Sequence, residues 1–219
     1  MEPLSEILFI CIAIPMIPML FILPEKRSRL FLGYMIIGCL ICLLSAALDH
    51  YFLELFNNDM RYVTTTITPV TEEILKALPV LYFAIIFNDD RDTLLSISFA
   101  AGVGFAILEN AVIFAKIIQN VSIEWAIIRV VGAALMHAAC TCLVGMGISY
   151  VHKRKKLFFS GTFALLMSAI IFHASFNVLI ESDYSAAALI MPTAIYIPVV
   201  VTEITRRRKA KKANAEKKQ

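Results

Sequence analysis

The sequence predicts an all-α membrane protein, a single bundle of about seven transmembrane helices. Its mean hydropathy is +0.78. Of its residues, 59% are hydrophobic and only 17% are charged, whereas soluble domains usually carry about a quarter charged residues. Apolar segments of about 20 residues, the length that crosses the hydrocarbon core, follow one another with short polar turns between them. Lipid is therefore expected to be the main solvent of this chain.

The predicted spans account for most of the 219 residues. They cover residues 7–23, 30–48, 67–87, 93–118, 127–151, 157–180 and 185–202. Because no turn between them is long enough to fold by itself, residues 1–205 are expected to form one transmembrane domain. Residues 206–219 are expected to be a disordered, basic cytoplasmic tail, since lysines, arginines and alanines offer nothing to bury.

Basic residues lie at alternate turns, and this pattern predicts the orientation of the chain. Cytoplasmic loops near span ends carry the excess of Lys and Arg. Outside the tail, the bases that follow the first, third and fifth predicted spans are Lys26, Arg27, Arg29, Arg91, Lys153, Arg154, Lys155 and Lys156. A multi-pass protein of the cell membrane is expected, with its N-terminus outside and its C-terminus in the cytoplasm. These bases are expected to contact the headgroups of the lipid bilayer and no nucleic acid.

Ionisable side chains inside the predicted spans are few. Each costs about 2.5 kcal/mol or more in mid-membrane, so those that occur usually face a cavity or a partner and mark function. Those in the interior of the third to sixth spans are Glu72, Glu73, Lys76, Glu109, His137 and His173, while Lys116 and Arg129 lie near the outer ends of the fourth and fifth spans. With a helical rise of about 1.5 Å per residue, the carboxylates and imidazoles lie roughly 8 to 15 Å from the outer ends of their spans. This common layer predicts one site built from four helices.

Helical spacing indicates which side chains share a face. Residues four apart do so, and the pairs of this kind are Glu72 with Lys76, Phe105 with Glu109, and His173 with Asn177. Glu73 lies about 100° around the helix from Glu72. Either the cavity side of this helix is wide enough for both carboxylates, or one of them serves as an orienting group.

Carboxylates, an ammonium and two imidazoles at one depth form a set that can activate water and stabilise an oxyanion. A buried glutamate can act as a general base, and a neutral histidine can donate a hydrogen bond to a developing negative charge. Hydrolysis of a peptide bond fits this inventory. A proton relay fits it as well.

Four sequence motifs on successive spans point to a known family. The stretch from Glu72 to Lys76 matches EExxK, and that from Phe105 to Asn110 matches FxxxEN. His137 stands alone, and His173 to Asn177 matches HxxxD/N. In this order and on these spans, within a motif core at 67–181, they resemble the PrsW-type intramembrane proteases, relatives of the CAAX-processing and bacteriocin-immunity membrane proteases.

The resemblance implies a metal-independent, glutamate-type endopeptidase that needs no cofactor. It implies that Glu72 or Glu73 activates water, while Glu109, His137 and His173 position the water or bind the oxyanion. The supporting residues that it implies are Lys76, Phe105, Asn110 and Asn177. The implied substrate is a membrane-anchored protein, such as an anti-sigma factor, cut near the extracytoplasmic side.

Two other functions fit the same residues. In a metal-dependent membrane protease, two histidines and a glutamate would hold zinc. A proton-coupled transporter also uses intramembrane glutamates and histidines, as a relay.

Overall fold

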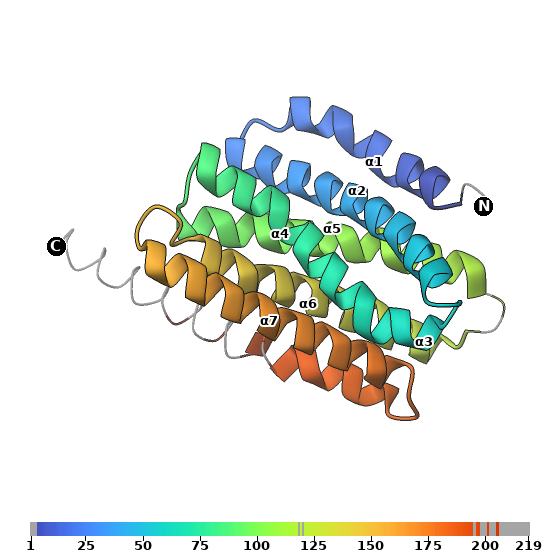
Figure 1. Ribbon diagram of the computed structural model, residues 1–219. Coiled ribbons are helices and arrows are strands. Elements are labelled where there is room, and N and C mark those ends of the chain that lie inside the picture. The colour runs from blue at the N-terminus through green and yellow to red at the C-terminus, as the bar shows by residue number, and fades with distance from the viewer. Residues whose placement is uncertain are drawn as a thin grey trace.

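The computed structural model describes residues 4–117, 119, 121–194, 196–197, 201 and 205. Throughout these residues the regular structure is helical, with no strand (Figure 1), so the predicted all-α class is confirmed. The elements are α1 (Leu4–Ile22), α2 (Lys26–Leu55), α3 (Met60–Tyr62), the π-helix η1 (Val63–Ile67), α4 (Thr68–Ile86), α5 (Arg91–Ile117), α6 (Ile123–Ile148) and α7 (Lys155–Ile180). A short apolar helix, Ser185–Ala194, follows α7.

In the described part of the chain, five helices are long and apolar enough to cross a membrane: α1, α2, α5, α6 and α7. Helix α4 coincides with the predicted span at 67–87, but three ionisable side chains reduce its apolar character, and all three are buried inside the protein. Of the predicted span at 185–202, the structure describes the helix Ser185–Ala194. Most of the remainder, with the whole tail at 206–219, lies outside the described residues.

Helix α2 is longer than the predicted span at 30–48. It runs from Lys26 to Leu55, because its last turns contain polar residues that end the hydropathy signal without ending the helix. The chain leaves the helical conformation at Asn57 and Asn58, whose φ angles are 54° and 61°. Asparagine is one of the few residues that adopts this left-handed conformation readily.

The centre of the bundle is α5, which packs against α2 on one side and α6 on the other, while α6 also packs against α7. Small residues allow these close approaches. A Cβ atom added at Gly102 of α5 would lie 2.6 Å from the carbonyl oxygen of His137 and from the Cα atom of Ala138 on α6. The helix that carries Glu109 therefore contacts the backbone of the helix that carries His137.

Helix α1 lies at the edge of the bundle beside α2 (Figure 1). Ala13 is its buried residue, and large apolar side chains such as Phe21 and Ile22 are 83% and 77% exposed. In a bilayer such side chains face the hydrocarbon core.

The turns gather at the two ends of the bundle (Figure 1). One end holds the N-terminal end of α1, the turn after α2 and the turn that follows α7. The other end holds the turns between α1 and α2, α4 and α5, and α6 and α7, where the basic residues used to predict the orientation lie. The orientation itself stays a prediction.

Candidate active site

The site begins where the chain passes from η1 into α4. A π-helical turn is rare and is frequently found at functional sites. Pro69 occupies the first turn of α4, where its missing N–H group removes no helical hydrogen bond. Over the next two turns Glu72, Glu73 and Lys76 are buried, with 3%, 0% and 0% of their surface exposed.

Lys76 is the cation at the centre of this cluster. Its Nζ atom donates to Glu73 Oε1 at 2.7 Å and to His137 Nδ1 at 2.8 Å, and it lies 3.9 Å from Glu72 Oε2. It also lies 4.7 Å from the centroid of the Phe105 ring. A fully buried ammonium requires such partners, because an unpaired buried charge is strongly destabilising.

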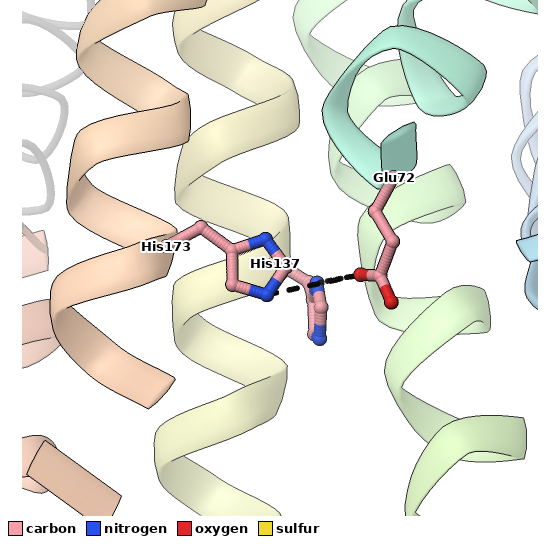
Figure 2. Close-up of side chains that lie close together, drawn as sticks. All are labelled: Glu72, His137 and His173. Atoms are coloured by element: carbon pink, nitrogen blue, oxygen red, sulfur yellow. Dashed lines mark ion pairs between the residues drawn. The ribbon is translucent and has the colours of Figure 1, made fainter. Parts of the chain in front are cut away.

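His173 of α7 is oriented by Glu73. Its Nδ1 atom lies 2.8 Å from Glu73 Oε1, and because a carboxylate can only accept, Nδ1 carries the proton. In the neutral ring, Nε2 is then the acceptor, and it lies 3.7 Å from Glu72 Oε2. Figure 2 shows the Glu72 carboxylate turned toward the imidazoles of His137 and His173.

His137 of α6 is held on both sides. Its Nδ1 atom accepts from Lys76, so its Nε2–H group is the donor toward Glu109 Oε2, 3.1 Å away. The other oxygen of Glu109 accepts from Arg129 Nη2 at 2.9 Å. A continuous series of charge-assisted contacts thus runs from Arg129 to His173, and contacts of this type are the strong ones.

Glu72 is the carboxylate that this series does not use. Lys76 pairs with Glu73, and Arg129 pairs with Glu109. Glu72 has no ion pair as short as these, because the nearest described cation, Lys76, is 3.9 Å away. Its buried Oε2 atom has no hydrogen-bond partner in the described structure. Glu72 also lines a cavity of about 740 Å³ together with Phe105, Glu109 and Arg129. Glu72 is therefore a residue of the cluster that borders the cavity and whose Oε2 atom no short hydrogen bond engages.

The structure brings together the five predicted catalytic residues, which lie on α4 to α7: Glu72, Glu73, Glu109, His137 and His173. Of the predicted supporting residues, Lys76 lies at the centre, and the Phe105 ring packs against His137 with centroids 4.8 Å apart. Asn177 lines the cavity and donates to the carbonyl oxygen of Thr64 in η1 at 3.0 Å. Asn110 is buried on α5, and its Oδ1 atom has no partner among the described residues.

Arg129 is the residue that the motifs missed. The sequence showed it only as a base near the outer end of a span, yet its side chain is 7% exposed and paired with Glu109. A signal was present, because Arg129 precedes His137 by two helical turns and so shares its face of α6. Asp49 was missed as well, since it lies beyond the predicted end of its span. It lines the cavity and accepts from the Thr68 hydroxyl at 2.8 Å.

The donor set also suits a metal ion. Glu72, His137 and His173 each offer one ligand atom, and these atoms lie within 4.8 Å of one another. Two histidines and a glutamate are the ligands of several catalytic zinc sites. The feature that opposes a dication here is the Lys76 ammonium, which is hydrogen bonded to His137 and lies 3.9 Å from Glu72.

Comparison with known proteins gives the family. A family model described as the PrsW family of intramembrane metalloproteases matches residues 26–202, well over half of the chain. No curated protein and no solved structure matches. The matched region contains the whole cluster, and with the apolar helices it makes this a multi-pass membrane protein. The predicted family is thus confirmed: the chain belongs to the PrsW family of intramembrane proteases.

Proposed function

We propose that this protein is an endopeptidase that cleaves a membrane-anchored protein with a water molecule activated by Glu72. The proposal is carried by Glu72, a carboxylate whose Oε2 atom has no hydrogen-bond partner among the described residues. It faces a cavity inside the helical bundle, 3.7 Å from the acceptor nitrogen of His173. A separation of this size between two acceptors suits a bridging water.

In the reaction, Glu72 removes a proton from this water, and the water oxygen bonds to the carbonyl carbon of the substrate. When the carbon–nitrogen bond breaks, Glu72 returns the proton to the leaving amine. A positioned general base typically contributes about 10² to 10⁴ in rate. The Lys76 ammonium, 3.9 Å from Glu72, supplies positive charge near the position where the oxyanion develops.

Glu73 has a different role in this proposal. One of its oxygens already accepts from both Lys76 and His173, at 2.7 and 2.8 Å. This contact fixes the tautomer and the orientation of His173. The other oxygen of Glu73 has no hydrogen-bond partner either, but Glu73 is not among the residues that line the cavity. Glu73 is therefore the orienting carboxylate of the pair.

The substrate is proposed to be a single-span or membrane-anchored protein of the anti-sigma-factor kind, as the family resemblance implies. Its scissile bond has to leave the helical conformation, because the backbone groups of a membrane helix are satisfied internally. The cavity is lined by residues near the end of the bundle opposite the basic turns, including Glu6, Met60 and Glu181. By the distribution of Lys and Arg, that end faces outward. Cleavage is therefore proposed to occur near the extracytoplasmic surface.

The test is cleavage of a labelled single-span substrate by the purified protein in lipid vesicles. The Glu72→Gln variant is expected to lose at least about 100-fold in rate, since it removes the base while keeping the shape of the side chain. The matched control is Glu54→Gln, which removes a carboxylate from α2 whose side chain is 68% exposed. Cleavage by Glu72→Gln at the rate of the control would exclude Glu72 as the base.

Zinc catalysis is the second candidate, favoured by the clustering of Glu72, His137 and His173 and by the description of the family. These residues would hold the ion, which would polarise the substrate carbonyl as a Lewis acid. Treatment with 1,10-phenanthroline separates the two mechanisms. The proposal expects undiminished cleavage, whereas a loss that added zinc restores would establish the metal-dependent reaction.

A further inference from the structure

Arg129 lies outside the sequence motifs but is built into the cluster. It is on α6, two turns before His137, and its side chain is 7% exposed. The guanidinium group lies 6.0 Å from the centroid of the Phe176 ring, and Nη2 donates to Glu109 Oε1 at 2.9 Å. A buried, fixed guanidinium of this kind can hold a carboxylate in one orientation.

The orientation of Glu109 matters because its two oxygens have different partners. Oε1 accepts from Arg129, and Oε2 accepts from His137 Nε2 at 3.1 Å. The opposite nitrogen of His137 accepts from Lys76. Arg129 is therefore connected to the ring of His137 through a single intervening residue.

Another cation lies on the same helix as Glu109. Lys116 is two turns further along α5 and also lines the cavity. It is exposed, and no ion pair with Glu109 occurs in the described structure. Without Arg129, the Glu109 carboxylate can turn toward Lys116 and the open part of the cavity. His137 would then lose its acceptor.

We propose that Arg129 is a positioning residue for the cleavage reaction, acting through Glu109 on His137. This inference rests on the proposed function. It assigns to Arg129 an effect on the chemical step, not on the binding of the substrate. Partners that orient a functional histidine in this way typically contribute about 10- to 100-fold.

The test is a set of kcat and KM measurements in vesicles with the single-span substrate. Arg129→Met is expected to lower kcat by about 10- to 100-fold with KM within about twofold of the wild type. Arg129→Lys keeps the positive charge and is expected to recover most of kcat. Lys153→Met, the matched control, removes a half-exposed cation that does not line the cavity and is expected to leave both constants unchanged.

A double substitution tests the route through Glu109. In the Glu109→Gln background, Arg129→Met is expected to cause no further loss, because the group on which Arg129 acts is already neutral. The double variant replaces both members of the buried ion pair, so neither charge is left without its partner. If Arg129→Met alone fails to accumulate, the kcat of the double variant is compared with that of Glu109→Gln. An additional loss in the double variant would overturn the proposal.

Other outcomes would overturn it too. A raised KM with unchanged kcat would show that Arg129 binds substrate, and an equal loss in Lys153→Met would show a general effect of a lost positive charge. Failure of Arg129→Lys to recover kcat would contradict a role based on the ion pair. Failure of the proposed function is distinguishable, since it would appear as no cleavage by the wild type or full cleavage by Glu72→Gln.

Discussion

Replacement of Lys76 by methionine should destabilise the folded protein more than any substitution at an exposed charge. The side chain is completely buried and pairs with Glu73 at 2.7 Å. Methionine has a similar length, so the change removes the ammonium and leaves the carboxylates of Glu72 and Glu73 buried together without their cation. His137 Nδ1 loses its donor as well.

The size of the effect follows from this burial. Removing one partner of a buried ion pair costs about 3 to 5 kcal/mol, because the other charge is left uncompensated. For a chain of this length, each kcal/mol lowers the melting temperature by about 2 to 4 °C, which gives a decrease of about 6 to 20 °C. The double variant Lys76→Met with Glu73→Gln removes both charges and should recover more than half of the loss.

Thermal unfolding in detergent, followed by circular dichroism, measures these differences. The matched control is Lys153→Met, since Lys153 is half exposed and pairs with Asp89 at 3.5 Å. An exposed pair contributes about 0 to 1 kcal/mol, so the control should unfold within about 4 °C of the wild type. Equal melting temperatures for Lys76→Met and the control would refute the assignment of Lys76 as a buried counterion.

Three further predictions concern the packing, the orientation and the role of Asn177. Gly102→Ala places a methyl group 2.6 Å from backbone atoms of α6 and should cost about 1 to 3 kcal/mol. Gly33→Ala, which meets nothing within 4 Å, should be neutral or stabilise α2 by up to about 1 kcal/mol, and chemical denaturation would separate the two. Reporter domains fused after residues 90 and 155 should appear in the cytoplasm and one near residue 121 outside; the reverse would invert the proposed side of cleavage. Asn177→Ala removes the 3.0 Å hydrogen bond to Thr64 of η1 and should lower the free energy of unfolding by about 1 kcal/mol. Cleavage by the folded fraction should persist. Loss of cleavage at unchanged stability would give Asn177 a direct role in the reaction.

Much of the fold could be predicted from hydropathy, because the apolar segments are as long as the helices that they form. Hydropathy predicts a helix less well where the helix continues through polar residues or contains buried charges. Helix α2 continues past residue 48 through Asp49 and His50 to Leu55. These two polar residues line the cavity and do not end the helix. Helix α4 shows the converse, since buried charges make a helix of the bundle look less apolar than its neighbours.

The members of the site could be predicted from their membrane depth and motifs, but their individual roles could not. Spacing places Glu72 and Glu73 on adjacent faces of α4, and only packing against α6 and α7 shows that Glu73 is engaged by Lys76 and His173. Arg129 was missed because charge near a span end is usually interfacial. Its burial depends on Glu109, a residue of a different helix, so the sequence offers only the face that Arg129 shares with His137 as a signal.

The most direct test compares the initial rates at which purified Glu72→Gln and Glu73→Gln cleave the same single-span substrate in vesicles. The proposed mechanism predicts that Glu72→Gln loses at least about 100-fold, and that Glu73→Gln, which keeps an oxygen to accept from His173, loses less, about 10- to 100-fold. The reverse order, with Glu72→Gln the more active variant, would contradict the assignment of Glu72 as the group that activates water.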